Sequence, residues 1–283
     1  MAAKRRPRQP APQGLLSKEE VREVEDRRPP RAAVIFEAVR REGDEELERP
    51  VLSLASSGLA AGMSMGFSLA TMGLLHAFLP AASWRPLVES MGYPIGFLIV
   101  ILGRQQLFTE NTLTVILPLL ASDDRIDTLR KIVRLWSIVF VANIAGGSIF
   151  AFTVARTDAF APPVREAFTA IATQTLANPD FGSLMVRGIF AGWLIALMIW
   201  LMPAADQSRP FVVLLVTYVV GVAGFSHIVA GSVEVLYLVA IGQVTFATYL
   251  WVFALPVFIG NIIGGVALVA LLNYGQVVAE AHG

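Results

Sequence analysis

The chain has 283 residues, of which 55% are hydrophobic and only 16% are charged, and its mean hydropathy is +0.63. Apolar stretches of about 20 residues, long enough to span a bilayer, recur about six times, which excludes an ordinary soluble protein and predicts a polytopic membrane protein. The chain contains no cysteine, so thiol catalysis, disulfides and thiolate metal sites are excluded. The formal net charge is zero, but twelve of the 22 lysine and arginine residues lie in Met1–Arg49.

Residues 1–50 are expected to be a charged cytoplasmic arm, partly disordered, with short helices. Ser17-Lys18-Glu19-Glu20 has the capping-box pattern, in which the first and fourth side chains each bond the other residue's backbone N–H. We therefore expect a helix from there to just before Pro29. A second, amphipathic helix is predicted over Ala32–Glu48. It could lie along the membrane face, pack against the bundle, or be solvated.

Six spanning segments are predicted in a channel domain of residues 51–275: roughly 51–79, 92–120, 132–155, 183–203, 210–241 and 246–273. The second and fifth segments are too long and too interrupted for single helices, so we predict that both are broken. An amphipathic helix over Pro162–Ala177 is expected on the outer surface. Residues 276–283 are expected to be a cytoplasmic tail. The lysine and arginine bias places both termini in the cytoplasm.

An inverted repeat is predicted, because six spans with both ends on one side can form two copies of three. The sequence Asn143-Ile-Ala-Gly-Gly147 in span three recurs as Asn261-Ile-Ile-Gly-Gly265 in span six, an offset of 261 − 143 = 118. Gly58 and Gly62 of span one resemble Gly188 and Gly192 of span four, at an offset of 188 − 58 = 130. The predicted fold is thus all-α, with two inverted three-helix halves.

The offset of 118 also carries Gly103 onto Gly221 and Thr109 onto His227. The polar interruption of span two therefore matches the interruption of span five, Gly221–Glu234, whose sequence is GVAGFSHIVAGSVE. Matching broken helices in inverted halves indicate a transport site near the midplane of the membrane.

His227 is the central candidate for the site, because an ionisable group at membrane depth marks a functional site by default. A neutral imidazole can donate a hydrogen bond to a passing anion or lend it a proton. The alternative is a structural histidine that bonds a backbone carbonyl freed at the break. Thr109 is expected to approach His227 from the other half. Leu107 and Phe108 are candidates for an apolar plug, although ordinary packing would explain them equally well.

Arg104, Glu110 and Glu234 also fall at membrane depth and should be paired or face water. Glu234 follows His227 by seven residues, about two helical turns, so both can face the same way. Arg104 is expected to be neutralised by Glu110 or Glu234. These residues are either structural ion pairs or substrate contacts.

Asn143 and Asn261, each followed by small residues, suit a close helix contact with a side-chain hydrogen bond across it. We predict an architectural role for both asparagines. No metal site and no cofactor are predicted.

The chain resembles the formate/nitrite transporter family in Leu107-Phe108-Thr109 with Asn111-Thr112, in Gly224-Phe225-x-His227, and in Gly260-Asn261-Ile-Ile-Gly-Gly265. The resemblance spans roughly residues 35–275. It implies an aquaporin-like protomer in a homopentamer of a bacterial inner membrane, with a pore in each subunit. It also implies that Leu107, Phe108, Thr109 and His227 line the pore, and that a small monovalent anion is protonated to its neutral acid on the way.

The sequence differs from the family at the outer vestibule, where family members carry a lysine that attracts anions. This chain has no counterpart, because its last lysine is Lys131. It is similar to the inner-membrane branch of the family with a long charged N-terminal arm.

The predicted function is therefore a membrane channel or transporter for a small monovalent anion, such as formate or nitrite, or for its conjugate acid. The alternatives are a neutral small-solute pore and a non-transporting membrane scaffold or sensor. An intramembrane enzyme is not expected, because the chain has no His-Glu-x-x-His motif and no Gly-x-Ser-x-Gly motif. The expected partners are the anion, the lipid bilayer and other copies of the chain, with no nucleic acid.

Overall fold

The computed structural model describes residues 17, 19, 20, 22, 24, 30–177 and 180–281. These residues are helical apart from short connections, and no strand occurs among them. The chain divides into two units, Met1–Arg31 and Ala32–Gly283.

In the first unit, the capping box is formed. The backbone N–H of Ser17 donates to Glu20 Oε2 at 2.7 Å, and the backbone N–H of Glu20 donates to Ser17 Oγ at 3.2 Å. These bonds hold the pKa of the Glu20 carboxyl below its usual range. The predicted end of this helix before Pro29 lies outside the described residues.

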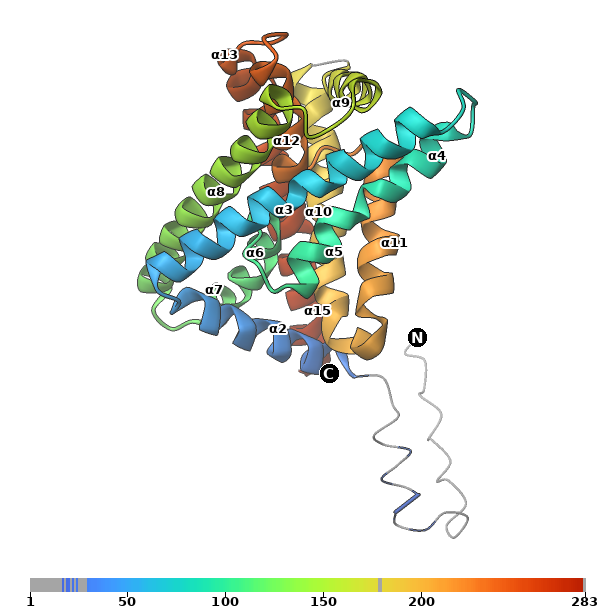
Figure 1. Ribbon diagram of the computed structural model, residues 1–283. Coiled ribbons are helices and arrows are strands. Elements are labelled where there is room, and N and C mark those ends of the chain that lie inside the picture. Colours follow the sequence, from blue (N-terminus) through green and yellow to red (C-terminus); the bar gives the residue numbers. More distant parts are fainter. Residues whose placement is uncertain are drawn as a thin grey trace. The chain divides into compact units, whose positions relative to one another are not determined.

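In the second unit, five helical stretches are long and apolar enough to cross a membrane: Val51–Phe78, Arg85–Leu102, Arg125–Arg156, Phe181–Val222 and Phe246–Ala279. The first and third are the single helices α3 and α8 (Figure 1). The second is built from α4 (Arg85–Glu89), η1 (Ser90–Gly92) and α5 (Pro94–Leu102).

The stretch Phe181–Val222 contains two spans rather than one. As a straight helix its 42 residues would measure about 63 Å, twice the thickness of the hydrocarbon core. It reverses at η2 (Asp206–Ser208), where Asp206 has a φ of 41°. The turn separates α10 (Phe181–Ala205) from α11 (Arg209–Val222).

The second and fifth spans are broken, as the sequence predicts. α5 ends at Leu102, and α6 (Phe108–Thr114) and α7 (Ile116–Ala121) complete the second span. α11 ends at Val222, and α12 (Ile228–Ala240) completes the fifth. With α3, α8, α10 and the last stretch, the described residues form six spans, which confirms the predicted all-α polytopic fold.

The sixth span combines several helical geometries. It runs through α13 (Phe246–Thr248), the π-helical η3 (Tyr249–Ala254), α14 (Leu255–Ile262) and the π-helical η4 (Ile263–Leu271). α15 (Leu272–Ala281) follows without interruption, so much of the predicted tail is helical. Its cytoplasmic location stays a prediction.

The amphipathic helix α2 (Ala32–Leu47) packs against the bundle, which is one of the three alternatives that the sequence left open for it. It buries Phe36, Val39 and Leu47, and the Phe36 ring lies 5.7 Å from the Tyr274 ring of α15. Arg134 of α8 donates to the Leu47 carbonyl at 2.7 Å, so the end of α2 is also held. In Figure 1, α2, α7 and α15 lie at one end of this unit.

At the opposite end lie α4, α13 and α9 (Pro162–Thr175) (Figure 1). α9 is the amphipathic helix predicted over Pro162–Ala177. It buries Val164, Phe168 and Ile171, and it packs on α3 and α12.

Asn143 of α8 bonds backbone groups on both sides of the first break. Its Nδ2 donates to the carbonyls of Gly58 in α3 and Gln106 in the break, both at 2.8 Å, and its Oδ1 accepts from the Phe108 N–H at 2.9 Å. The side chain is fully buried. Since lipid offers no partner to a freed backbone group, this amide replaces the missing helical hydrogen bonds.

Asn261 of α14 repeats the arrangement in the second half. Its Nδ2 donates to the carbonyls of Gly188 (2.8 Å) and Ser226 (2.9 Å), and its Oδ1 accepts from the Ile228 N–H at 2.9 Å. The backbone of Asn261 lies so close to Gly192 that a Cβ at this glycine would overlap it. The architectural role predicted for both asparagines agrees with these contacts.

The same contacts correct the predicted register of the breaks. The two asparagines bond Phe108 and Ile228, which are 228 − 108 = 120 positions apart, not 118. Left-handed backbone occurs at Arg104 (φ 51°) and Gly224 (φ 64°), again 224 − 104 = 120 apart. The first half has two more residues between its break and its asparagine.

The predicted pairing of Gly103 with Gly221 is therefore wrong. Gly103 caps the end of α5, and Ala223 caps the end of α11. Gly221 lies inside α11 against the Tyr93 ring. By the same shift, the position that matches Thr109 is Val229 rather than His227.

We expect Asn143→Ala and Asn261→Ala each to destabilise the protein by about 2 kcal/mol or more, because three backbone groups lose a buried partner. The measurement is thermal unfolding of the detergent-solubilised protein. Asn273→Ala is the matched control, because Asn273 Nδ2 has no partner among the described residues. Equal unfolding temperatures for all three variants would contradict this role of the two amides.

Candidate functional site

Thr109 and His227 meet where the two half-helices begin. Thr109 is the second residue of α6 and His227 precedes the first residue of α12. Thr109 Oγ1 and His227 Nε2 are 2.7 Å apart, and both side chains are buried. The predicted approach of this hydroxyl and this imidazole across the two halves is thus present, although the two positions are not equivalent in the repeat.

The hydrogen bonds of His227 determine its tautomer. Nδ1 accepts from the backbone N–H of Ala230 at 3.2 Å, so Nδ1 carries no proton. The proton of the neutral ring is then on Nε2, which donates to Thr109 Oγ1. His227 therefore bonds an N–H and a hydroxyl, not the freed carbonyl of the alternative interpretation. The Thr109 hydroxyl keeps its hydrogen for another acceptor.

Two cavities approach this pair from opposite ends of the bundle. The α9-side cavity has a volume of about 540 Å³, and its lining includes Tyr93, Arg187, His227 and Glu234. The α2-side cavity has a volume of about 450 Å³, and its lining includes the following residues of α2, α6 and the first break: Glu42, Glu46, Arg104, Gln106, Glu110 and Asn111. The Thr109–His227 contact lies between them.

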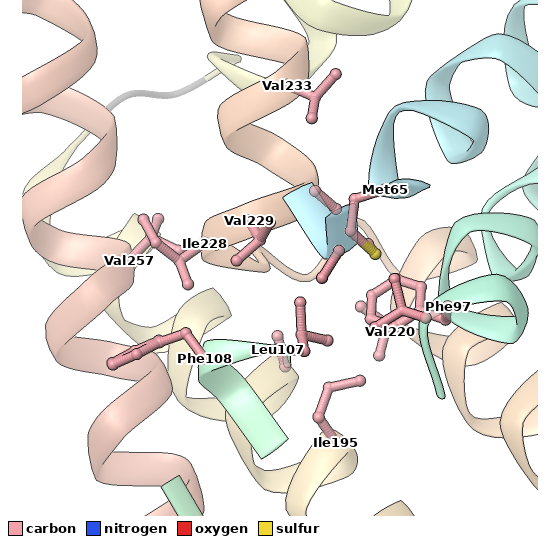
Figure 2. Close-up of a cluster of buried hydrophobic side chains, with 14 of the residues drawn as sticks. Met65, Phe97, Leu107, Phe108, Ile195, Val220, Ile228, Val229, Val233 and Val257 are labelled. Atoms are coloured by element: carbon pink, nitrogen blue, oxygen red, sulfur yellow. The ribbon is translucent and has the colours of Figure 1, made fainter. Parts of the chain in front are cut away.

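Buried apolar side chains surround the residues next to the Thr109–His227 pair. Leu107 is completely buried and lines neither cavity. Figure 2 shows it in the middle of the buried cluster, with Phe97 and Val220 on one side and Phe108 and Val257 on the other. The Phe97 ring meets the His227 ring edge to face, with centroids 4.9 Å apart. The plug role of Leu107 stays a prediction, and Phe97 is a further apolar neighbour of His227 that the sequence analysis missed.

Phe108, the second residue predicted to form the plug, lies in different surroundings from Leu107. Its ring stacks on Phe258 at 5.1 Å and touches Phe140 and Trp136 edge to face. It lines neither cavity and is completely buried. The structure therefore favours ordinary packing for Phe108, because the aromatic residues of α8 and α14 enclose it.

The prediction that Glu110 or Glu234 neutralises Arg104 is wrong. Arg104 Nη2 lies 3.3 Å from Glu42 Oε1 on α2, and its side chain is 76% exposed. Glu110 and Glu234 are instead in the walls of opposite cavities, Glu110 on the α2 side and Glu234 on the α9 side. Within the described residues, neither of these carboxylates forms an ion pair.

The first break is also linked to α2. Glu46 accepts a hydrogen bond from Gln106 Nε2 at 2.8 Å, next to Leu107 in the chain. Burial raises the pKa of Glu46, and the nearby Arg49 guanidinium offsets part of this rise. α2 thereby forms part of the wall of the α2-side cavity.

We expect His227 to carry its proton on Nε2 near neutral pH, which ¹⁵N NMR of histidine-labelled protein in detergent would measure. Thr109→Val removes the acceptor of this proton and should shift the His227 Nε2 resonance, whereas Thr109→Ser should restore it. A ring protonated on Nδ1 would contradict the assignment.

The chain is similar to known membrane transport proteins. The family model described as "Formate/nitrite transporter" matches residues 33–275. The chain is 40% identical to the inner membrane protein YfdC of Escherichia coli (strain K12) over 253 residues, which cover 89% of this chain and 81% of that protein. It is 25% identical to the formate channel BtFdhC of Bacillus thuringiensis over 252 residues, covering 85% and 93%.

Among solved structures, a pentameric formate channel with formate bound shares the fold, with a TM-score of 0.68 at 18% identity. The match covers 84% of this chain and 99% of that one. The six spans and the relatives make the chain a multi-pass inner-membrane protein that acts in transport and not as an enzyme. It belongs to the formate/nitrite transporter family.

Proposed function

We propose that the chain forms a pore for a small monovalent anion of a weak acid, such as formate or nitrite, which crosses the barrier as the neutral acid. The observation that carries this proposal is the Thr109–His227 pair, held between two cavities beside the buried Leu107. A hydroxyl with a free hydrogen is the polar group that this narrow point offers to a substrate.

Two guanidinium groups of the α9-side cavity can attract an anion, although the carboxyl groups of Glu89 and Glu234 line the same cavity. Arg85 and Arg187 both line it, one from the start of α4 and one from α10. The N-terminal end of α12, which carries the positive end of its dipole, faces the barrier from the same cavity. In this proposal, these two guanidinium groups serve in place of the vestibule lysine that the chain lacks.

The barrier itself favours a neutral species. Leu107, Phe97 and Val220 offer no hydrogen bond, and transfer of an ionised carboxylate into such surroundings costs far more than transfer of the neutral acid. A strong-acid anion such as chloride has no accessible neutral form. The pore should therefore separate weak-acid anions from chloride.

The orientation and the assembly follow the sequence and the relatives. The excess of lysine and arginine in Met1–Arg49 supports cytoplasmic termini, so the α2-side cavity would face the cytoplasm and the α9-side cavity the outside. The solved relative is a pentamer with the same fold, which supports a homopentamer with a pore in each subunit. The predicted cytoplasmic arm of residues 1–50 is kept in this proposal only for residues 1–31, because α2 belongs to the second unit.

Proteoliposomes with a pH-sensitive dye inside would test the function. We expect inward gradients of formate, nitrite, acetate, lactate or hydrosulfide to acidify the interior when the acid fits the pore, and chloride to leave it unchanged. His227→Ala should lower the uptake of the best substrate by about tenfold or more without unfolding the protein.

Two conservative variants sharpen this test. Thr109→Ser keeps the hydroxyl and should keep most of the uptake, whereas Thr109→Val should lose it. If the wild-type protein moves none of these acids, or if urea and glycerol pass as readily as formic acid, the proposed function is contradicted. Uptake by the His227→Ala variant at the wild-type rate would remove the role of the ring.

A further inference from the structure

A buried carboxyl group lies in the wall of the α9-side cavity, and the pore described above does not use it. Glu234 is 5% exposed and follows His227 by seven residues, about 10 Å along α12 toward the mouth of the cavity. An anion that enters from this side therefore passes Glu234 before it reaches the barrier.

The two carboxyl oxygens of Glu234 have different surroundings. Oε2 accepts a hydrogen bond from the Thr175 hydroxyl at the end of α9. Oε1 has no partner among the described residues and is open to the cavity. When the carboxyl group is protonated, its hydrogen can sit on Oε1, the oxygen that a substrate can reach.

The other titratable and charged groups that line the same cavity come from α3, α4 and α10 and from the residues just before α5 and α12: His76, Arg85, Glu89, Tyr93, Arg187 and His227. His76 is paired with Glu89, at 2.8 Å between Nδ1 and Oε2. Glu234 forms no ion pair with any of them within the described residues. Ionisable groups inside a membrane mark substrate pathways and proton relays.

His227 is poorly placed to supply the proton that the substrate needs. Its Nδ1 already accepts from Ala230, so the ring cannot be protonated there without breaking that bond. Loss of the remaining proton from Nε2 would leave an imidazolate anion. The Tyr93 phenol is also a much weaker acid than a carboxyl group. Glu89 and Glu234 are the lining groups whose ordinary acidity matches that of a carboxylic-acid substrate, and Glu89 is already paired with His76.

The repeat gives an independent indication. The position of the first half that matches Glu234 is 234 − 120 = 114, and Thr114 occupies it. The asparagines that hold the breaks are present in both halves, but this carboxyl group is present in only one. Its presence is therefore not required by the architecture of the repeat.

We propose that Glu234 is the proton-exchange group for the substrate in the α9-side cavity, an inference that rests on the proposed function. The O–H bond of the protonated carboxyl breaks, and a new O–H bond forms on the anion, which continues to the barrier as the neutral acid. The carboxylate takes a proton back from water in the cavity. The reverse steps serve export, and no electron transfer is involved.

Glu234→Gln tests this proposal, because the amide keeps the size of the side chain and still accepts from Thr175 but cannot exchange a proton. Radiolabelled formate uptake would be measured in proteoliposomes over a range of external pH. We expect the variant to be slower by about tenfold or more and to lose the dependence of the rate on external pH. Glu166→Gln, an exposed carboxyl on α9 outside the cavity lining, is the matched control and should behave like the wild type.

Two further variants keep the test decisive if Glu234→Gln fails to fold. Glu234→Asp retains a carboxyl group, and Thr175→Val removes only its hydrogen bond, so both should keep the pH dependence at a reduced rate. Wild-type rate and pH profile in Glu234→Gln would overturn the proposal. Faster uptake at every pH would also overturn it, because the carboxylate would then only repel anions.

The same experiment separates this inference from the proposed function. A wild-type protein that moves no weak acid contradicts the proposed function, whatever Glu234 does. A wild-type protein that moves formate, combined with an unchanged Glu234→Gln variant, contradicts the role of Glu234 alone.

Discussion

Backbone groups that are freed in the middle of a membrane must find partners within the protein, and this constraint governs the structure. Each half breaks a spanning helix, and each break leaves one N–H and one carbonyl group that a single asparagine amide bonds. The third bond of each amide reaches the first helix of its own half, at Gly58 or Gly188. Three spans are thereby joined at one buried side chain, and only small residues allow the close approach.

The pore is a consequence of this arrangement. With the breaks held, α6 and α12 both begin at the centre, so the first polar side chains of the two half-helices meet as the Thr109–His227 pair. Leu107 is buried beside them, and Glu110 in the first turn of α6 and Glu234 in the middle of α12 line opposite cavities. The polar contact thus lies where the two half-helices begin, and the two carboxyl groups line the cavities.

Sequence reasoning identified the broken spans, the asparagines and the Thr109–His227 contact, because each rests on a residue type that membrane interiors rarely tolerate. The register failed because the offset of the two asparagine motifs was applied to the breaks, although the first half has two more residues between its break and its asparagine. The left-handed turn of the first break is made by Arg104, and no residue preference points to an arginine there. The Arg104–Glu42 pair joins positions 62 residues apart and depends on how α2 packs. Phe108 and Phe97 are both apolar residues of span two, and only the neighbouring helices determine that Phe97 faces His227.

The central claim is that a closed barrier at the meeting point of the half-helices separates two cavities that open to opposite sides. Because the chain has no cysteine, a single introduced thiol can be followed without background labelling. Ala223→Cys places a thiol in the α9-side cavity and Gln105→Cys places one in the α2-side cavity. With a membrane-impermeant thiol reagent, the account predicts labelling of the first only in spheroplasts and of the second only in inverted membrane vesicles. Labelling of both thiols from the same side of the membrane would contradict it.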